Sequence, residues 1–503
     1  MGRSAKPFLC GFKSHPSLSL FLFRKEKNVG EKEKLNMKMV LRIYNTLSRK
    51  LEEFKPLRED RVGVYVCGLT VYDYMHIGHA RTYIAFDVIL RYLKYRGYNV
   101  TYIQNITDID DKIIRRAKEK NISPMNLSKD YAEKALEDQE KLNITKANGY
   151  PMVSDNIKEI ISAIQRLIDK GHAYVADGNV YFDVSTFPDY GKLSHQDIEQ
   201  LKKHRIEPDK RKRTPLDFLL WKESNDDEIG FESPWGYGRP GWHIECSVMS
   251  QKYLGDQFDI HGGALDLVFP HHENEIAQSE SLTGKKPFVK YWLHTGFLSS
   301  SGEKMSKSLG NIISVREFLK KHSKEALRLF LLQTHYRSPV DYSEDNIFST
   351  EKAIERLKKF RRELDIILSK ADYDGNYRIQ EISYKLRKDF IEYMDDDFNT
   401  PKAVASIFDA VRKINSLLTE NESKKSIEQT IDIFDELMEI LGIEINLSEA
   451  ELTMEEKKLI DMRNKYRKEK NWVEADKIRR LLLERGIEII DKNDITLYNK
   501  KSK

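Results

Sequence analysis

The strongest constraint on the fold is a strand, helix and strand pattern within about 45 residues near the start of the chain. The run VGVYVCG at 62–68 is apolar, rich in β-branched and aromatic residues and closed by glycine, as buried parallel strands are. Apolar residues recur at three- and four-residue spacing from Ile84 to Leu93, which predicts an amphipathic helix ending near Gly97. Residues 100–106 supply the next strand. This βαβ unit predicts an α/β fold, a Rossmann-like doubly wound parallel sheet with its ligand at the strands' carboxyl ends.

The remaining sequence changes character several times, and 503 residues are too many for one compact core. We expect seven parts in chain order: an extension that is disordered or follows a mis-assigned start at 1–38, the first half of the α/β domain at 39–150, an insertion at 151–225, the second half of the α/β domain at 226–300, a loop and linking region at 301–349, an α-helical bundle at 350–449 and a small basic C-terminal domain at 450–503. The bundle rests on four amphipathic stretches at 351–370, 379–394, 402–418 and 426–441. The C-terminal domain is expected to hold two charged helices and then a strand near 487–490.

Composition excludes several classes of protein. With 40% hydrophobic and 33% charged residues, the chain is neither disordered nor collagen-like. The longest apolar run near the N-terminus, 20–23, is far shorter than the ~20 residues of a membrane-spanning helix. Three cysteines lie far apart, which favours a reducing, cytoplasmic setting over a disulfide framework. Both ends of the chain are basic, which is compatible with binding nucleic acid and equally with solvated helix faces.

The first chemical signal is the string YDYMHIGH at 72–79, between the first strand and the first helix. A helix N-terminus offers unpaired N–H groups to a phosphate, and Gly78 lets the backbone approach such a ligand. His76 and His79 could donate hydrogen bonds to a phosphate in a transition state. The alternative is a pair of surface histidines, but the position after the first strand favours a phosphate site.

The second signal is KMSKS at 304–308, flanked by small residues. Lys304 and Lys307 on such a loop can close over a triphosphate and neutralise the charge that develops as pyrophosphate leaves. A solvated basic loop is the alternative, and this string alone does not decide between the two. Both strings in this order, each in its expected local setting, favour a nucleotide-binding function.

The third constellation is Cys67, Cys246, His271 and Glu275. The last two are four residues apart in HHENEIAQSES, a segment that reads as helical, so both would point to one face. Cys67 ends the first strand, at the edge where a parallel sheet presents its ligands. Thiolate, imidazole and carboxylate together suit Zn²⁺. Without a Cys-x-x-Cys motif, buried structural cysteines and a surface His/Glu pair remain the alternative.

From about Met39 onward the sequence closely resembles the cysteinyl-tRNA synthetases, a family of class I aminoacyl-tRNA synthetases. The two strings correspond to the HIGH and KMSKS signatures of that class. Seven longer blocks carry the resemblance to the cysteine enzymes: YVCGLTVYDYMHIGHAR at 65–81, NITDIDDKIIRRA at 105–117, GRPGWHIECSVMS at 238–250, FDIHGG at 258–263, FPHHENEIAQSE at 269–280, HYRSPVDYSEDN at 335–346 and MDDDFNTPKA at 394–403.

The resemblance implies activation of L-cysteine by Mg²⁺-bound ATP to cysteinyl-adenylate. The cysteinyl group then passes to the 3′-terminal ribose of tRNA(Cys), and pyrophosphate and AMP are released. It assigns His76, Gly78, His79 and Lys307 to ATP, and Lys304 and Lys307 to the leaving pyrophosphate. Positioning and charge stabilisation would supply most of the rate enhancement.

The resemblance also implies one Zn²⁺ per chain, held by four ligands: Cys67, Cys246, His271 and Glu275. The ion would bind the substrate thiolate and reject serine, because packing alone discriminates poorly against a one-atom change. Trp242 and His261 would wall the amino-acid pocket, with ordinary core packing as the alternative.

The partners implied by the resemblance are tRNA(Cys), L-cysteine and ATP, with no membrane. The insertion would meet the acceptor end, the bundle the elbow and anticodon stem, and the final domain the anticodon. We expect a monomer, because no dedicated dimer interface is recognisable. Two departures from the family pattern concern RNA and nucleotide contacts: ITLY at 495–498 stands where Gly-Thr-x-Trp is usual, and Ala264 replaces a third glycine.

Two rival functions use the same core. A cysteine:amino-sugar ligase would share the catalytic core and zinc but lack a full tail such as 350–503. An inactive RNA-binding relative would be expected to have lost some of the residues named above, and all are present.

Overall fold

The structure is a computed structural model that describes residues 40–196, 210–225, 228–300, 302–304, 312–371, 375–419, 422–445, 452–492 and 495–500. Residues 41–503 belong to one compact unit. The extension expected at 1–38 and Lys307 of the second signature lie outside the described residues.

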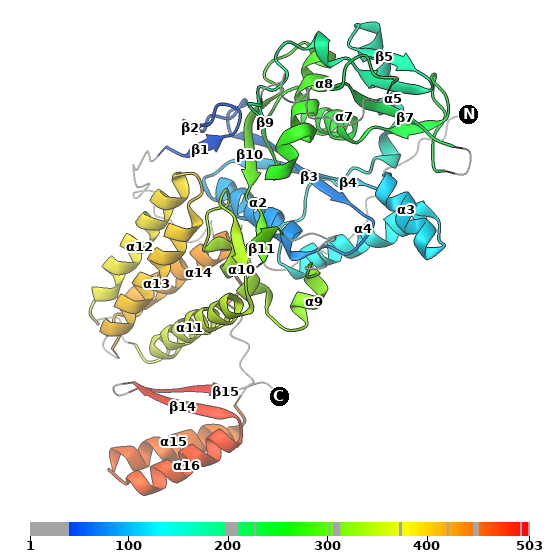
Figure 1. Ribbon diagram of the computed structural model, residues 1–503. Helices are drawn as coiled ribbons and strands as arrows, with labels where there is room; N and C mark the ends of the chain where they lie inside the picture. The colour runs from blue at the N-terminus through cyan, green and yellow to red at the C-terminus, as the bar shows by residue number, and fades with distance from the viewer. Residues whose placement is uncertain are drawn as a thin grey trace, which may run out of the picture. The chain divides into compact units, whose positions relative to one another are not determined.

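A four-stranded parallel sheet with the order β10-β9-β3-β4 lies at the centre of the catalytic region. Its strands are β3 (Arg61–Thr70), β4 (Asn99–Thr107), β9 (Phe258–Ala264) and β10 (Val289–Thr295). The expected βαβ unit is confirmed, because α2 (Ile77–Tyr95) connects β3 to β4 (Figure 1). Since β4 and β9 lie on opposite sides of β3, the strand order reverses between β3 and β9, where a doubly wound sheet has its ligand crevice.

The sheet separates two hydrophobic cores. Val62, Val64 and Val66 of β3 belong to the core that includes α2 and later helices. Tyr65 and Cys67 belong to a second core on the other face. The alternation is that of a strand buried on both faces, as in other parallel sheets with helices on each side.

The sequence suggests that the first strand ends at Cys67, but β3 continues to Thr70. Its pairing with β9 ends at Val66, and its pairing with β4 becomes irregular at the same point. At Gly68 a β-carbon would lie 1.5 Å from the carbonyl oxygen of Asn105, so only glycine permits this approach of the two strands. Cys67 therefore lies where regular pairing stops, at the edge of the sheet formed by the carboxyl ends of its strands.

The insertion folds as an antiparallel sheet with the order β5-β6-β7-β8. Its elements are α5 (Ile157–Asp169), β5 (Ala173–Ala176), β6 (Asn179–Phe182), β7 (Phe218–Glu223) and β8 (Gly238–Pro240). β8 lies beyond the expected boundary at 225. Its sequence, GRP, has no strand pattern, and its conformation depends on pairing with β7.

Further helices and short strands complete the catalytic region (Figure 1). They are β1 (Arg42–Asn45), β2 (Lys50–Glu53), α3 (Asp111–Lys120), α4 (Pro124–Lys141), α7 (Trp242–Leu254), α8 (Glu273–Thr283), β11 (Leu298–Ser300), β12 (Glu303–Lys304), α9 (Val315–Leu319), α10 (Lys324–Leu332) and β13 (Val340–Tyr342).

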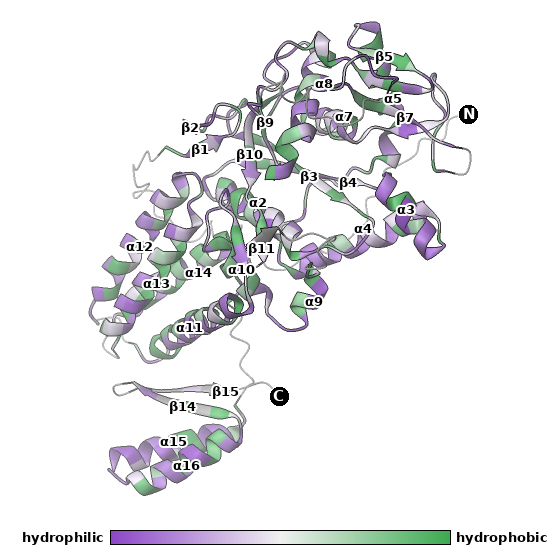
Figure 2. Cartoon of the chain, in the orientation of Figure 1, coloured by the Kyte–Doolittle hydropathy of each residue, from purple (hydrophilic) through white to green (hydrophobic). Residues whose placement is uncertain are grey.

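Four long helices follow, as the periodicity predicts: α11 (Glu344–Leu368), α12 (Arg378–Asp395), α13 (Thr400–Leu417) and α14 (Lys424–Leu441). α12 packs against α13 and α14, and α11 packs against α14. Figure 2 shows hydrophilic and hydrophobic stretches on each of these helices, as amphipathic sequences require. None of the helices in the described ranges combines the length and apolarity needed to cross a membrane.

A small module with its own core ends the chain: α15 (Met454–Lys468), α16 (Trp472–Glu484), β14 (Ile487–Lys492) and β15 (Ile495–Lys500). Ile460, Ile478, Leu482, Ile487 and Ile489 are buried in that core. The sequence indicates both helices and the first strand. The second strand contains ITLY and pairs antiparallel with β14.

Candidate functional site

Sulfur, imidazole and carboxylate groups meet where β3 loses its regular pairing. The ligand atoms of Cys67, His271, His272 and Glu275 lie within 4.8 Å of one another, and all four residues are buried. Glu275 Oε1 lies 3.0 Å from His271 Nε2 and 3.8 Å from Cys67 Sγ. The structure therefore brings three of the four expected ligands together.

Cys246, the fourth expected ligand, lies beside this cluster on α7. Its sulfur is 3.9 Å from Cys67 Sγ and 3.7 Å from Asn105 Oδ1. A hydrogen bond from the Cys67 thiol is the main influence that lowers the pKa of Cys246 to about 6. Burial raises the pKa of Cys67 well above its usual value. The lowered pKa of Cys246 favours the thiolate, which is the form of cysteine that binds a metal.

His272 is not among the expected ligands, yet its Nε2 lies 3.2 Å from Cys67 Sγ. Its Nδ1 is 2.8 Å from Nε2 of His294, whose Nδ1 is 2.8 Å from Thr46 Oγ1. Burial lowers the pKa of His272 well below its usual value and that of His294 to about 3, so both imidazoles are neutral. The one sequence signal for His272 is its adjacency to His271.

The helix that carries Glu275 begins later than the sequence suggests. α8 starts at Glu273, and both histidines lie in a preceding π-helical turn, η4 (Val268–His272), in which Phe269 is not helical. A π turn changes the angular spacing of successive side chains. From this turn the imidazoles of both histidines reach the cluster.

Two imidazoles orient Glu275. Its Oε2 lies 2.8 Å from Nε2 of His261, and its Oε1 faces His271. Burial alone would raise the pKa of Glu275, but these two histidines lower it to about 2, so the carboxylate is ionised. Thiolate, carboxylate and imidazole donors in one buried place form the ligand set that Zn²⁺ prefers. The residues present therefore fit this metal.

The HIGH signature forms the N-terminus of α2. His76 is the N-cap, and its Nδ1 accepts a hydrogen bond from the backbone N–H of His79 at 3.2 Å. The two rings stack with their centroids 3.5 Å apart. A β-carbon on Gly78 would lie 2.9 Å from His76 Nδ1, so glycine makes room for this pair. The first turn of α2 holds no acidic residue, which leaves its positive end available to an anion.

The chain just after the KMSKS string is attached to this signature. The backbone N–H of Val315 donates to the carbonyl oxygen of Met75 at 2.8 Å. The backbone of Lys304 belongs to β12, whereas its side chain and Lys307 lie outside the described residues. Their place at the nucleotide stays a prediction.

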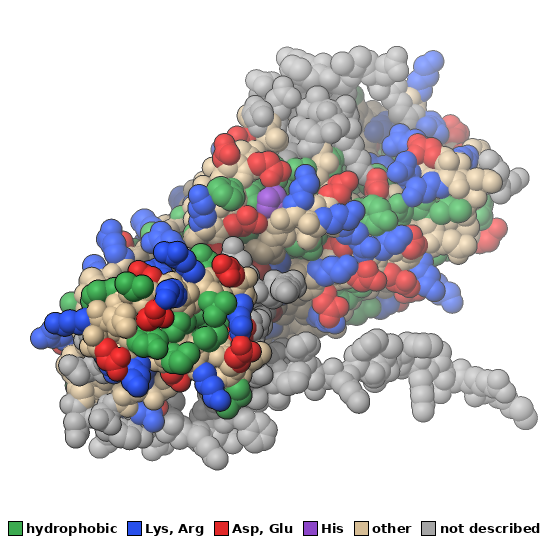
Figure 3. All heavy atoms as spheres, turned by 90° about the horizontal axis from the view of Figure 1, so that it is seen from below, with side chains coloured by type: hydrophobic (Ala, Val, Ile, Leu, Met, Phe, Trp, Pro, Cys, Tyr) green, Lys and Arg blue, Asp and Glu red, His purple; other side chains and the backbone are tan. Residues whose placement is uncertain are grey.

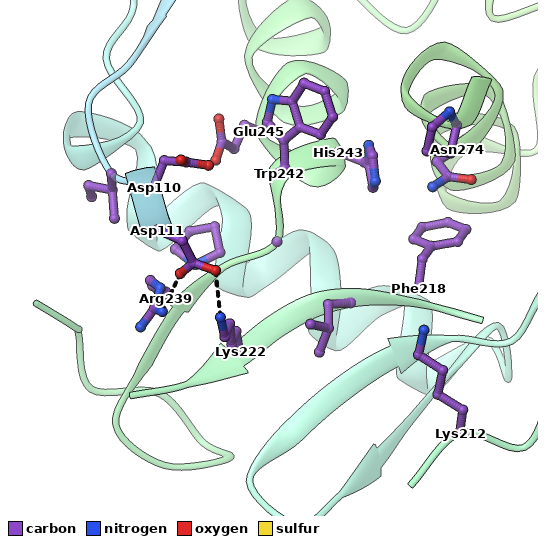
Figure 4. A pocket seen from close by; sticks show the side chains of 15 residues that line it. Asp110, Asp111, Lys212, Phe218, Lys222, Arg239, Trp242, His243, Glu245 and Asn274 are labelled. Atoms are coloured by element: carbon purple, nitrogen blue, oxygen red, sulfur yellow. Dashed lines mark hydrogen bonds and ion pairs between the residues drawn. The ribbon is translucent and has the colours of Figure 1, made fainter. Parts of the chain in front are cut away.

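A cavity of about 270 Å³ opens between the insertion and the core (Figure 4). Trp242 lines it and is 41% exposed, and its ring centroid lies 4.3 Å from that of His271. His261 does not line this cavity and is fully buried beside Glu275. The two expected pocket residues therefore have different positions. Trp242 forms part of the cavity wall, whereas His261 contacts Glu275 in the interior.

Ion pairs in the cavity join the insertion to the start of α3. Lys222 Nζ of β7 lies 2.6 Å from Asp111 Oδ2 at the start of α3, and Arg239 of β8 binds the other oxygen (Figure 4). Burial raises the pKa of Asp111, but the hydrogen bonds from both cations outweigh it and lower the pKa below its usual value. The cavity thus contains fixed charges of both signs.

Two family models match the chain. Residues 53–352 match the "tRNA synthetases class I (C) catalytic domain", and residues 389–446 match the "DALR domain". The first range contains the parallel sheet, the insertion and the cluster, and the second contains the end of α12 and the whole of α13 and α14.

Curated relatives match nearly all of the chain. A "Cysteine--tRNA ligase" of Thermococcus onnurineus is 47% identical over 476 residues, which cover 92% of this chain and 100% of the relative. That of Thermococcus gammatolerans is 49% identical over 92% of this chain and 99% of its own length. That of Heliobacterium modesticaldum is 47% identical over 90% and 98%.

Solved structures share the fold at low sequence identity. Mycobacterium tuberculosis methionyl-tRNA synthetase in complex with methionyl-adenylate matches with a TM-score of 0.58 at 17% identity, over 76% of this chain and 89% of that one. The Agrobacterium radiobacter LeuRS ternary complex matches with a TM-score of 0.56 at 11% identity, over 78% and 85%.

Proposed function

Because the chain belongs to the cysteine--tRNA ligases, a family of class I tRNA synthetases, we propose how its residues perform that reaction. The enzyme activates L-cysteine with ATP to cysteinyl-adenylate and pyrophosphate, then transfers the cysteinyl group to the 3′-terminal ribose of tRNA(Cys), releasing AMP. The buried Cys/His/Glu cluster carries the residue assignment, because with a bound metal it would form a thiol-selective site at the sheet edge where a doubly wound fold binds its ligands.

We assign the zinc ligands to Cys67, Cys246, His271 and Glu275. A bound Zn²⁺ supplies a soft Lewis acid that favours the thiolate of cysteine over the hydroxyl of serine. The lowered pKa values of Cys246 and Glu275 favour the anionic forms that such an ion binds. His261 holds the carboxylate in place, as outer-shell partners of metal ligands do.

We assign ATP to the N-terminus of α2. His76 and His79 would donate to the triphosphate as charge develops on it, and Mg²⁺ would arrive with the nucleotide. Lys304 and Lys307 would hold the leaving pyrophosphate. The bond from Val315 to Met75 supports this role, because it anchors one end of the loop beside the histidines.

We propose that the cavity beside Trp242 receives the 3′ end of the tRNA. Lys222 and Arg239 reach it from the insertion, which suits a phosphate-bearing strand. Trp242 offers an aromatic face to a base, and Asp110 offers a carboxylate to ribose hydroxyls. The contact between Trp242 and His271 would bring that ribose close to the cysteine carboxyl group.

We propose that the bundle binds the elbow and anticodon stem and that the C-terminal module reads the anticodon. This module exposes apolar side chains beside basic ones, as stacking of single-stranded bases requires (Figure 3). Trp472 is 56% exposed, and the Arg467 guanidinium lies 5.9 Å from its ring centre. Val473 and Leu483 are also exposed.

The amino-sugar ligase is not supported, because the chain matches cysteine--tRNA ligases along their whole length and includes a DALR domain. We propose that the enzyme acts as a monomer in the cytoplasm. The free thiols of Cys67 and Cys246 suit a reducing setting.

Charging of total tRNA with labelled cysteine, with serine in parallel, tests the function. We expect charging with cysteine alone, lost when zinc is removed by a chelator and restored when zinc is returned. Cysteine-dependent ATP–pyrophosphate exchange without any charged tRNA would contradict the acceptor. Charging that persists in zinc-free protein would contradict the metal assignment.

A further inference from the structure

We propose that Arg316 is a positioning residue of the nucleotide site and holds His76 in place from outside that site. Its guanidinium is fixed to α4, and the chain that carries it is bonded to the backbone on both sides of His76. This inference rests on the role proposed for His76 toward ATP, and it adds a residue that belongs to neither signature.

The chain that follows the KMSKS string pairs with the start of α2 by two backbone hydrogen bonds. The N–H of Ile77 donates to the carbonyl oxygen of Ile313 at 3.0 Å, and that of Val315 donates to Met75 at 2.8 Å. The two bonds lie on either side of His76. The backbone of this histidine is therefore held by a segment more than 230 residues away in the sequence.

The same antiparallel register brings Arg316 opposite Tyr74. His76 forms an isolated antiparallel bridge with Ser314, and Tyr74 and Arg316 each lie two residues farther from this pair. Residues opposite each other in such a pair interact through their side chains. The guanidinium carbon of Arg316 lies 5.2 Å from the centre of the Tyr74 ring. A side-chain contact thus extends the backbone pairing by one step.

Arg316 is anchored to α4 through three acceptors. Its Nε donates to Asp138 Oδ1 at 2.8 Å, and its Nη2 donates to Glu137 Oε2 at 2.7 Å and to the carbonyl oxygen of Lys134 at 3.3 Å. The Asp138 side chain is fully buried. Since removing one partner of a pair that contains a buried charge is strongly destabilising, this anchor is rigid.

These contacts make Arg316 a support and not a ligand of the triphosphate. The carboxylates of Glu137 and Asp138 lie beside its guanidinium, so their negative charges offset the attraction that it would exert on a phosphate. The ring of Tyr74 lies over the same group. Arg316 therefore acts on the site through the chain to which it belongs.

His76 depends on such a support because little regular structure precedes it. It is the N-cap of α2 and has an extended backbone, and residues 71–75 form neither helix nor strand. A group that stabilises developing charge has to be placed accurately, since a misplacement of about 1 Å can cost ~100-fold in rate. Pairing with the segment fixed by Arg316 supplies this accuracy.

The test compares the full-length variants Arg316→Gln and Lys192→Gln. Lys192 is a matched control: its Nζ lies 2.6 Å from the buried carboxylate of Glu280 and 5.4 Å from the centre of the Phe187 ring. The two side chains are similarly exposed, 28% for Arg316 and 25% for Lys192. Both changes therefore remove a half-buried cation that contacts a buried carboxylate and an aromatic ring.

The first readout is cysteine-dependent ATP–pyrophosphate exchange. We expect Arg316→Gln to lower kcat about tenfold and to leave the KM for cysteine unchanged, because the proposed zinc ligands lie on other elements. Lys192→Gln should change neither value by more than about twofold. In thermal unfolding the two variants should lose similar stability, so a difference in kcat reports positioning and not general damage.

The second readout is the coupling between Arg316 and His76. His76→Asn serves as the background, since asparagine can still cap α2 but offers no imidazole. If Arg316 acts through His76, adding Arg316→Gln to this background should lower kcat by no more than about twofold. Arg316→Lys keeps the charge without the planar fork that reaches both carboxylates, so its kcat should lie between those of Arg316→Gln and the natural chain.

Unchanged exchange in Arg316→Gln, or an equal loss in Lys192→Gln, would overturn the proposal. A loss that is undiminished in the His76→Asn background would also overturn it, because Arg316 would then act on another group. If Arg316→Gln did not fold, Arg316→Lys would carry the same comparison. Exchange that is intact in His76→Asn would refute the proposed role of the signature itself, whereas exchange lowered by His76→Asn alone would refute only Arg316.

Discussion

The proposed zinc ligands are polar groups that depend on one another for hydrogen bonds and opposite charges, because they are buried away from water. Cys67, His271 and Glu275 are all buried, and an uncompensated charge at such depth is expensive. Each donor is prepared by a neighbour: Cys246 by the thiol of Cys67, and Glu275 by His261.

At the residue scale we predict that Cys246→Ser lowers zinc content well below one ion per chain. A serine hydroxyl stays protonated and is a hard ligand, so the loss of affinity should exceed the ~10–100-fold of an outer-shell change. Mass spectrometry of the metal in purified protein measures the effect, and circular dichroism checks the fold. Cys10→Ser is the matched control, because Cys10 belongs to no proposed ligand set. Near-stoichiometric zinc in Cys246→Ser would refute the assignment.

The ligands could be assigned from the sequence only through the family resemblance, because Cys67 and Cys246 are far apart in the chain and have no diagnostic spacing. The chain from His272 to His294 to Thr46 could not be found that way. It joins residues from three separate segments, and neither helical nor strand periodicity relates positions so distant.

At the scale of secondary structure, α2 is joined to the helices that follow the catalytic region. Arg328 of α10 is fully buried and donates to Asp87 of α2 at 2.5 Å. The same guanidinium donates to the carbonyl oxygens of Leu441 at 2.9 Å and Leu142 at 3.0 Å. One side chain therefore connects α2, α10 and the ends of α4 and α14.

We predict that Asp87→Asn destabilises the protein by roughly 3 kcal/mol at neutral pH, because it leaves the Arg328 charge buried and unpaired. Burial raises the pKa of Asp87, but Arg91, Arg328 and Thr145 outweigh it and lower the pKa below the usual value. A lowered pKa means that the stabilisation is complete above ~pH 4, where the unfolded carboxyl is ionised, and disappears as the pH falls through the lower native pKa.

Urea unfolding from pH 7 to pH 3 measures this difference, which should shrink in acid. Asp389→Asn is the control: Asp389 pairs with the exposed Lys385, and such pairs contribute less than about 1 kcal/mol. Equal stability of Asp87→Asn and the natural chain at pH 7 would contradict the prediction.

We predict that Gly442→Ala is clearly more destabilising than Gly284→Ala. Both glycines end helices with positive φ, +66° and +74°, which costs an alanine about 1–2 kcal/mol. At Gly442 the added β-carbon would also lie 2.0 Å from Arg328 Nη2, whereas at Gly284 no atom lies within 4 Å. Thermal unfolding should show at least twice the loss for Gly442→Ala; equal losses would mean that Arg328 moves freely.

Three of the four bundle helices, α12 to α14, were predictable within two residues, because each shows its buried face in its own sequence, whereas α11 begins at Glu344, before the expected start at 351. β8, the π turn before α8 and β15 were not predictable. β8 and β15 depend on pairing with strands elsewhere in the chain, and the turn contains a residue, Phe269, that breaks the helical phase. Local periodicity carries none of this information.

For the whole molecule, the insertion contributes to the catalytic region through the cavity of Figure 4. We predict that Lys222→Gln reduces transfer of cysteine to tRNA by about tenfold, while ATP–pyrophosphate exchange changes less than twofold, because this cation faces the proposed RNA site and not the adenylate. Single-turnover transfer from preformed adenylate, at two salt concentrations, measures the effect.

Lys285→Gln is the matched control, because Lys285 forms an exposed pair with Asp256 and does not line the cavity. Transfer that is unaffected by Lys222→Gln, or exchange that falls in parallel with transfer, would contradict the proposed place of the acceptor end.

The length of α2 limits how freely the parts of such an enzyme can be exchanged. Its 19 residues extend about 28 Å from the histidines at one end to Tyr92 and Arg96 near the other. Tyr92 donates to Asp395 of α12 at 2.7 Å, and Arg96 pairs with the same carboxylate. A chimera with the helical bundle of another protein would need a carboxylate at the position of Asp395. Without it, Arg96 at the end of α2 would lose its ion-pair partner. Exchange of segments between synthetases should therefore succeed when α2 and α12 are taken from the same parent protein.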